Sequence, residues 1–497
     1  MSYQLKVKTM PVDPKSTEDF LADAAKAADV IQETIKDDGF IHVFSHLDAD
    51  GIAAAGIIGK ALFRMDARFR IRITQWVDEK IINEIVADKP ELVIFTDFGS
   101  GYIDLLNEKI PSFKVVILDH HQTASTAQNP NFIQVNPHKQ GMDGATDVSG
   151  SGVAYFAARA MDKRNVDLAP IAIVGALGDM QDRYDQRKLG ILNGLIVEDA
   201  MNAKLIQVEK DLMFFGRETR PIHKALASTT NPFIPGISGQ EDESLAFLSS
   251  LKIPLKKEDR MRSLRDLTEE ERRRLCSALA DHLLSKGLHY EVTNLIGHIY
   301  ILNQEERWTP LRDAREFAVV LNSTGRMDRP SLGIAVCMGD RKVALEEADE
   351  VLDEYRKSIS KYLIWVWEKP ERLRELEYIY VVNGEDFVSE KIIGTISSIL
   401  MSSLPNVEKP LIAYANVPNE GLAKLSARTT DLGVHKGVNL GEVMRAAGEK
   451  YGGKGGGHNI AAGGQVPLDK VADFVKAAND IVGQQLRGER IAGNNTA

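Results

Sequence analysis

Residues 39–65, GFIHVFSHLDADGIAAAGIIGKALFRM, decide the fold class and raise the first question about function. The apolar run that ends near Ser45 is typical of a buried strand, and the small apolar residues after it predict a helix packed closely on a sheet. Between the two lie three side chains of the metal-ligand type: His46, Asp48 and Asp50. Taken alone, this group is either a solvated turn or the first part of a metal site.

The same arrangement recurs downstream. Strand-like runs occupy residues 68–77, 91–101, 113–122 and 131–139, and two of them end in acid or imidazole: Asp97, and Asp119, His120 and His121. The segment GALGDMQD (175–182) adds Asp179 and Asp182 after another apolar run. Strands that alternate with helices predict an α/β fold with a mostly parallel sheet. Because ligands of such sheets bind beyond the carboxyl ends of the strands, we expect these side chains to converge on one edge.

The ligand chemistry points to a particular class of metal. Carboxylates and imidazoles without cysteine suit Mn²⁺ or Mg²⁺ better than structural zinc. So many acids at one edge would repel one another unless cations neutralised them. Two ions about 3.5–4 Å apart generate hydroxide and bind a phosphoryl oxygen, so the pattern predicts metal-assisted hydrolysis of a phosphoester or phosphoanhydride. The alternative is a set of solvated loop acids.

Composition limits the class of protein and its cellular setting. The formal net charge of the 497 residues is −10, from 61 basic and 71 acidic side chains, which argues against a general nucleic-acid coat protein but not against a local basic groove. Two cysteines in so long a chain do not form a disulfide framework, so we expect a reducing, cytoplasmic setting. We expect no membrane span, since no apolar run approaches the roughly 20 residues that one needs.

Five motifs together resemble a known family. SHLDADG (45–51), DFGSG (97–101), LDHH (118–121) and GDMQD (178–182), in that order, resemble the motifs of the DHH phosphoesterase superfamily. GGKGGGHNIAAGG (452–464) resembles the glycine-rich signature of the C-terminal domain associated with it. The short HLDAD spacing is similar to the nucleic-acid and phosphodiesterase branch rather than to enzymes that cleave small phosphoanhydrides.

The resemblance implies roles for the strand-end residues. Two ions, Mn²⁺ or Mg²⁺, would be held by Asp48, Asp50, Asp97, His120 and Asp179. Asp97 would bridge the ions, and His46 would be a ligand or an orienting neighbour. Asp119 would orient the imidazole of His120, and His121 would face the scissile phosphate.

The distal half resembles RecJ-type exonucleases. LNSTGRMDRP (321–330) is similar to a RecJ segment, residues 344–369 to its connector helix, and KLSARTT (424–430) to a strand that offers Ser and Arg to substrate phosphate. The resemblance implies substrate contacts by Arg326, Ser426, Arg428, Gly455, Gly456, Gly457 and His458. From the residues alone, the glycine stretch either lets backbone N–H groups approach a phosphate or is a flexible linker. Arg326 and Arg428 either contact phosphate or lie on the surface.

We expect four parts along the chain. Residues 1–200 form a parallel-sheet DHH domain with the metal site, and 201–315 a helix-rich insertion in which Thr268 and Glu271 predict a capping box. Residues 316–375 hold the RecJ-like segment and connector helix, and 376–497 a smaller α/β substrate-binding domain with a disordered tail. The insertion resembles the middle domain of archaeal RecJ-like proteins, and this resemblance alone implies a partnership with the GINS complex at the replication fork.

The sequence therefore predicts a metal-dependent, single-strand-specific exonuclease. Its substrate would be DNA, with RNA as a second candidate, its products mononucleotides, and its setting DNA replication or repair. Two alternatives stay open. One is a phosphodiesterase for oligoribonucleotides or cyclic dinucleotides, and the other is a non-catalytic scaffold at the replication fork.

Overall fold

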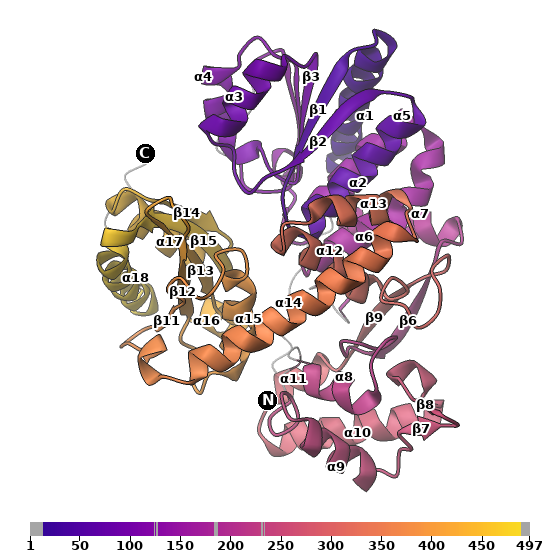
Figure 1. The fold of residues 1–497 in the computed structure, drawn as a ribbon, viewed down its shortest axis with the longest axis vertical. Coiled ribbons are helices and arrows are strands. Elements are labelled where there is room, and N and C mark those ends of the chain that lie inside the picture. Colours follow the sequence, from indigo (N-terminus) through magenta and orange to yellow (C-terminus); the bar gives the residue numbers. More distant parts are fainter. Residues whose placement is uncertain are drawn as a thin grey trace. The chain divides into compact units, whose positions relative to one another are not determined.

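The computed structural model describes residues 13–488 except 124, 126, 127, 183–186, 230, 231 and 233. The chain divides into two compact units, Met1–Leu352 and Asp353–Ala497, which are coloured along the chain in Figure 1. The tail that we expect to be disordered is RGERIAGNNTA (487–497), and its residues from 489 onward lie outside the described residues.

A five-stranded parallel sheet with the order β2-β1-β3-β4-β5 lies at the centre of unit 1. Its strands are β1 (Phe40–Ser45), β2 (Arg68–Ile73), β3 (Leu92–Thr96), β4 (Val115–Leu118) and β5 (Phe132–Val135). Ser45 pairs with Thr96, and Thr96 with Leu118, so β1, β3 and β4 end side by side. The predicted α/β fold is confirmed, and whatever follows these strands emerges at one edge of the sheet.

Helices cover both faces of this sheet (Figure 1). One core joins the strands to α1 (Pro14–Lys36), α2 (Ala49–Arg64), α5 (Gly150–Met161) and α6 (Ala169–Gly178). The other joins them to α3 (Glu79–Asp88) and α4 (Ile103–Lys109). Successive strand residues alternate between the two cores: Val43 enters the first and Phe44 the second. Burial on both faces explains why β1 reads as a continuous apolar run.

A second, helix-rich part of unit 1 follows α7 (Ile191–Asn202). It begins and ends with an antiparallel pair, β6 (Ile206–Leu212) and β9 (Ile296–Leu302). Between them lie α8 (Ile222–Ser228), α9 (Glu241–Ser250), β7 (Lys256–Lys257), β8 (Arg260–Met261), α10 (Glu269–Ser285) and α11 (His289–Thr293). This part, called the insertion below, has an apolar core of its own.

The predicted capping box at the start of α10 is confirmed. The Thr268 hydroxyl accepts from the Glu271 N–H at 3.2 Å, and the Glu271 carboxylate accepts from the Thr268 N–H at 2.8 Å. Two backbone donors that a helix start leaves unbonded are satisfied in this way.

The chain returns from the insertion to the first core through α12 (Ala314–Arg326) and α13 (Pro330–Met338). Both helices pack on α2, where glycines allow a close approach. A Cβ at Gly56 would lie 2.3 Å from that of Cys337. The long helix α14 (Val343–Trp367) begins in unit 1 and ends in unit 2.

Unit 2 is built on a mixed six-stranded sheet with the order β10-β11-β12-β13-β15-β14. Its strands are β10 (Leu373–Glu375), β11 (Tyr380–Asn383), β12 (Leu411–Val417), β13 (Leu422–Arg428), β14 (Lys454–Gly457) and β15 (Ala461–Pro467). Its later helices are α15 (Ile393–Ser403), α16 (Asp431–His435), α17 (Leu440–Lys450) and α18 (Val471–Leu486).

The glycine stretch of unit 2 is a strand, so the flexible-linker interpretation is wrong. Gly455 and Gly456 of β14 pair with Gly464 and Gly463 of β15. A Cβ at Gly455 would lie 2.2 Å from the Met444 carbonyl oxygen of α17, and only a residue without a side chain fits there.

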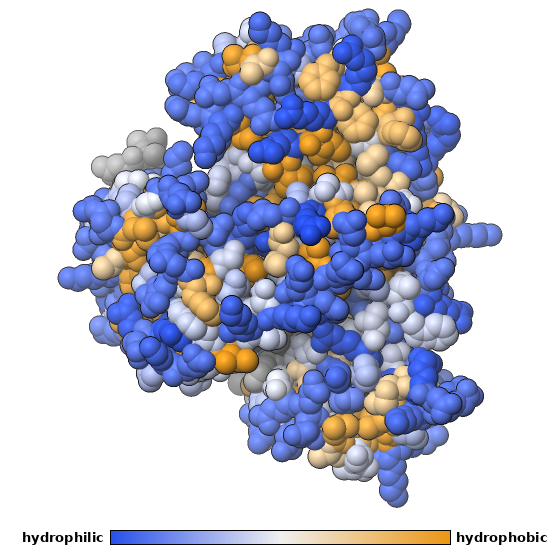
Figure 2. Space-filling view, viewed as in Figure 1, coloured by the Kyte–Doolittle hydropathy of each residue, from blue (hydrophilic) through white to orange (hydrophobic). Residues whose placement is uncertain are grey.

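The face shown in Figure 2 is mainly hydrophilic, with one gathering of apolar side chains over the region of β2, α2 and α5. Phe63 of α2 is among the large apolar residues that are exposed. Over the described part of the chain, helices with the length and apolar character of a membrane span are absent.

Candidate metal centre

Ligand-type side chains meet where β1, β3 and β4 end. Atoms that could hold a cation lie within 4.8 Å of one another in two groups: Asp50, Asp97, His120 and Asp179, and His46, Asp48 and Asp97. Asp97 belongs to both groups, which is what a residue bridging two ions requires. His121 joins Asp97 and His120 in a third, overlapping group.

The first group centres on the His120 imidazole, which is 1% exposed. Its Nε2 lies 3.2 Å from Asp97 Oδ1, 3.4 Å from Asp179 Oδ2 and 3.8 Å from Asp50 Oδ2. Three carboxylates and one imidazole nitrogen thus face the same small volume.

The second group centres on His46, whose Nδ1 lies 2.9 Å from Asp48 Oδ2 and 3.7 Å from Asp97 Oδ2. Both carboxylate oxygens of Asp97, with Nε2 of His120, are buried without a hydrogen-bond partner among the described residues. Buried polar atoms are almost always bonded, so these three atoms, which face one another, fit a cation ligand set. The donor types are those of Mn²⁺ or Mg²⁺ sites.

A second group of acidic residues, outside the candidate centre, differs from it in its ion-pair partners. Glu84 and Asp88 of α3 lie near His42 of β1. The guanidinium of Arg70 donates to both carboxylates at 2.9 Å, and Arg72 Nε lies 3.8 Å from Glu84, so the protein itself supplies their counter-charges. Within the described part of the chain, the carboxylate of Asp97 has no such guanidinium beside it.

The backbone around Asp97 and Asp50 shapes the centre. Asp97 has a φ of +62°, a left-handed conformation that non-glycine residues adopt mainly at special sites. A Cβ at Gly150 would lie 2.4 Å from Asp97 Oδ1. The first N–H groups of α5 bind Asp50: Gly150 N donates at 2.6 Å and Ser151 N at 3.0 Å. The positive end of α5 therefore stabilises this carboxylate.

These contacts of α5 were not predicted from the sequence. The small residues VSGSGV (148–153) were the available signal, because Ser149 caps a helix that begins with glycine. Gly175 was missed as well, although a Cβ there would lie 2.5 Å from Asp50 Oδ1.

The two adjacent histidines have different partners. The expectation that Asp119 orients His120 is wrong: His120 Nδ1 donates to the Gly144 carbonyl at 2.6 Å, which leaves Nε2 for a metal. Asp119 Oδ1 instead accepts from His121 Nδ1 at 2.9 Å and from the His121 N–H at 3.1 Å. The Asp119 carboxylate also accepts from the His120 N–H at 2.7 Å, so it holds the backbone of His120 and not its ring, although the two imidazole rings lie 4.3 Å apart. Gln181, also missed, donates to the Gly144 carbonyl at 2.8 Å.

Charge at the centre is strongly unbalanced. Burial lowers the pKa of His46, but the carboxylates of Asp48 and Asp97 outweigh it and raise this pKa to about 10. Burial and the charge of Asp97 raise the pKa of Asp50 to about 7. Burial and neighbouring carboxylates raise the pKa of Asp179 well above its usual value. Raised pKa values of adjacent carboxyl groups and of an imidazole indicate an excess of negative charge, which a bound cation would stabilise.

The remaining candidates lie in three places. Asp182 is fully buried but pairs with Arg315, away from the ligand groups. Burial raises the pKa of Asp48, but His46 outweighs it and lowers this pKa, with a smaller contribution from Arg326 at the end of α12. In unit 2, the hydroxyls of Ser426 and Ser397 lie 2.9 Å apart, and Arg428 Nε donates to the Ser398 hydroxyl at 2.8 Å.

The glycine signature of unit 2 holds three further predicted positions, Gly456, Gly457 and His458. The His458 N–H donates to the Ala461 carbonyl at 2.8 Å and closes the turn between β14 and β15. A Cβ added at Gly456 would meet no described atom within 4 Å, whereas Gly457 has a φ of +138°. Positive φ, which favours glycine, therefore occurs at Gly457 and not at Gly456.

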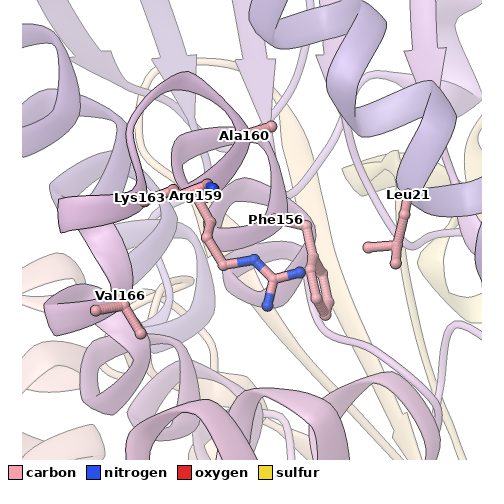
Figure 3. Close-up of a pocket in the computed structure, with 6 residues that line it drawn as sticks. All are labelled: Leu21, Phe156, Arg159, Ala160, Lys163 and Val166. Carbon is pink, nitrogen blue, oxygen red and sulfur yellow. The ribbon is translucent and has the colours of Figure 1, made fainter. Parts of the chain in front are cut away.

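A surface hollow elsewhere in unit 1 is a different feature. Figure 3 shows its lining residues: Leu21, Phe156, Arg159, Ala160, Lys163 and Val166. The guanidinium of Arg159 extends over the Phe156 ring, 5.2 Å from its centre, and pairs with Asp199. None of the lining residues belongs to the ligand groups, so the hollow is not part of the candidate centre.

Comparison with solved structures supports the fold. Exonuclease RecJ bound to manganese is 16% identical, with a TM-score of 0.55 and coverage of 95% of this chain and 97% of that one. RecJ from Thermus thermophilus in complex with Mn²⁺ is 15% identical, with a TM-score of 0.56 over 93% of this chain, which spans only 55% of that protein. CDC45 from Entamoeba histolytica is 12% identical, with a TM-score of 0.63 and coverage of 93% and 99%.

Sequence comparison identifies the family. Three family models match: the N-terminal domain of the DHH family over residues 40–177, the DHH-CID domain over 214–296 and the DHHA1 domain over 376–484. An uncharacterized protein of Methanocaldococcus jannaschii is 32% identical over 475 residues, which are 94% of this chain and 99% of the relative. The suspected resemblance is thereby confirmed, and the chain belongs to the DHH family of phosphoesterases.

Proposed function

We propose that this protein is a metal-dependent exonuclease that hydrolyses the phosphodiester bonds of single-stranded nucleic acid to mononucleotides. DNA is the proposed substrate, RNA a second candidate, and DNA replication or repair the proposed setting. The observation that carries the proposal is the Asp97 carboxylate, whose two buried oxygens lack hydrogen bonds from the described residues and lie between two groups of ligand atoms. Such a carboxylate suits a pair of divalent ions.

We assign different roles, metal binding and proton donation, to the residues of the candidate centre. Asp48, Asp50, Asp97, His120 and Asp179 would hold two ions, Mn²⁺ or Mg²⁺, with His46 as a further ligand or neighbour. When bound, the ions supply Lewis acidity and a nucleophilic hydroxide. His121 is the proton donor that we assign to the substrate, because its side chain is 47% exposed and Asp119 fixes its Nδ1, which leaves Nε2 to meet a phosphate oxygen.

Contacts along the strand would come from both units. Arg326 follows Gly325, which packs on the Leu47 carbonyl in the turn that carries Asp48, and we assign Arg326 to the phosphate next to the scissile bond. In unit 2, Arg428 and Ser426 project from β13 beside the start of α15, and a helix start together with a guanidinium binds phosphate. We assign Gly455, Gly456, Gly457 and His458 to the same substrate strand.

A cleavage assay tests the proposal. Purified protein with Mn²⁺ is incubated with a long single strand labelled at the 5′ or the 3′ end, a duplex, a dinucleotide and a cyclic dinucleotide. We expect stepwise shortening of the single strand and loss of activity with chelator. Cleavage of the small substrates alone would replace the proposal with a small-substrate phosphodiesterase.

A scaffold without catalysis is the second candidate, because the likeness to CDC45 extends over 99% of that chain. The ligand groups argue for activity, and a protein that binds Mn²⁺ but cleaves none of the substrates would support the scaffold. We also propose that the insertion meets a replication partner such as the GINS complex. Pull-down with and without residues 214–296 tests this contact.

A further inference from the structure

The helix α12 begins at the insertion with two buried carboxylates. Asp313 and Glu316 are 4% and 3% exposed. Asp313 caps the helix, because its carboxylate accepts from Arg315 N at 2.8 Å and from Glu316 N at 3.3 Å. A buried carboxylate is costly unless its oxygens are bonded, so the partners of Glu316 show what it is built to hold.

Both oxygens of Glu316 bind the insertion. Oε1 accepts from the Glu218 N–H at 2.8 Å, and Oε2 accepts from the Thr219 hydroxyl at 2.5 Å. Glu218 is itself held in the insertion, because its carboxylate pairs with Arg265 at 2.6 Å and with Arg217 at 3.5 Å. Glu316 therefore fastens the start of α12 to a rigid part of the insertion.

The neighbouring residue, Arg315, fastens the same helix to the segment that follows the candidate ligand Asp179. Arg315 pairs with the fully buried Asp182, which also lies 3.4 Å from Arg187 Nε. Asp182 is three residues beyond the candidate ligand Asp179. The first turn of α12 thus joins the insertion to the segment that carries a ligand.

The far end of α12 meets the turn that carries Asp48. Gly325 packs so closely that a Cβ there would lie 1.7 Å from the Leu47 carbonyl oxygen. Arg326 follows Gly325 at the end of α12, next to this contact with Leu47, the residue that precedes Asp48. A helix of 13 residues is a rigid rod about 20 Å long, so a shift at its start moves its end.

We propose that Glu316 is a positioning residue, through which the insertion sets the place of Arg326 beside the metal centre. The proposal rests on the phosphate contact assigned to Arg326 above. Loosening the bond between Glu316 and Thr219 lets α12 shift, which weakens the grip on a long strand but leaves the ligands of the metal centre in place.

Kinetics on two substrates test this role. Thr219→Val removes one donor to Glu316 with little change of volume, Glu316→Gln removes its charge, and Glu270→Gln is the control at an exposed pair of the insertion. For a long strand, we expect KM to rise roughly fivefold or more in both variants. The rate on bis(p-nitrophenyl) phosphate stays unchanged. In an Arg326→Ala background, Thr219→Val adds nothing, and an equal added loss there would overturn the proposal.

Hydrogen exchange tests the positioning role of Glu316 independently of nuclease activity. In Thr219→Val, we expect faster amide exchange at the end of α12, over residues 323–327, with the protection of β4 unchanged. Unaltered exchange over 323–327 would refute the positioning role even if the enzyme cleaves single strands as proposed. Conversely, a protein that cleaves no strand but shows this local change would refute the proposed function and leave the positioning role standing.

Discussion

Asp97 is placed by the backbone around it as much as by its own rotamer. It leaves β3 with a positive φ, and the absence of a side chain at Gly150 makes room for its carboxylate. Asp97 could be predicted from the sequence, because an acidic residue directly after an apolar strand is a recognisable pattern. Gly150 could not be predicted, because no local rule says which later helix will face a given strand end.

Asp97→Asn keeps the size of the side chain and removes the charge that would serve both ions. Loss of an outer-shell partner typically costs 10–100-fold, so loss of a shared ligand should cost roughly a thousandfold or more in nuclease rate. The fold should survive, since the centre lies beyond the strands. Calorimetric Mn²⁺ titration and circular dichroism check both statements, and near wild-type cleavage at saturating metal would exclude a bridging role.

Gly150→Ala tests whether the space beside Asp97 matters. The new methyl would lie 2.4 Å from Asp97 Oδ1, so the carboxylate must move and Mn²⁺ affinity should fall at least tenfold, by about 1.4 kcal/mol or more. Gly101→Ala is the matched control, because a Cβ there has no described neighbour within 4 Å. If both variants bind Mn²⁺ as the wild type does, the packing of α5 on Asp97 is unimportant for the site.

At the scale of elements, β14 and α10 show what a pattern can and cannot reveal. The capping box of α10 was predictable because its two residues lie three apart and its two hydrogen bonds are local. The glycines of β14 resembled a loop, because strand propensity is low for glycine and the register is set by a distant strand. Pairing with a distant strand, and not local propensity, therefore makes the glycine stretch a strand.

Alanine substitutions in β14 should separate packing from substrate contact. Gly455→Ala places a methyl 2.2 Å from the Met444 carbonyl and should destabilise unit 2 by about 1–3 kcal/mol. Gly456→Ala meets no described atom and should change stability by less than about 0.5 kcal/mol. Urea unfolding monitored by hydrogen exchange in unit 2 measures both. Weaker strand binding by a stable Gly456→Ala protein would point to a contact of β14 with substrate.

The start of α10 should depend on pH through Glu271. The hydrogen bond from Arg262 lowers the pKa of Glu271 from 4.5 to about 2, with further donors at the capping box. The stabilisation is therefore full above about pH 4.5 and is lost as the pH falls towards 2. Glu271→Gln should remove this part of the pH dependence of amide exchange in α10. Glu270→Gln, at an exposed pair, should behave as the wild type does.

At the scale of the whole molecule, the order of the motifs carried the most information. The fold class followed from strands and helices in alternation, and the family from five motifs in a fixed order along the chain. The ion network around Arg217, Glu218 and Glu316 could not be foreseen. Its partners are charged residues without periodicity, and only the meeting of the insertion with α12 brings them together.

Arg428 tests whether the second unit holds the strand on which the first unit acts. A guanidinium bound to a backbone phosphate releases about one counterion, so Arg428→Ala should reduce the slope of log Kd against log salt by about one. Affinity for long single strands falls, and hydrolysis of bis(p-nitrophenyl) phosphate is unchanged, because no strand has to be held. Arg374→Ala removes the same charge from β10, at the opposite edge of the sheet from β14.

The comparison of Arg428→Ala with Arg374→Ala distinguishes direct binding of the strand by Arg428 from a general electrostatic effect of unit 2. Equal weakening by Arg374→Ala and Arg428→Ala would mean that unit 2 contributes only its overall charge. Loss of small-diester hydrolysis in Arg428→Ala would place its effect at the metal centre or in folding instead. A change of slope confined to Arg428→Ala, with the small diester untouched, assigns β13 to the nucleic-acid backbone and the chemistry to the ligands around Asp97.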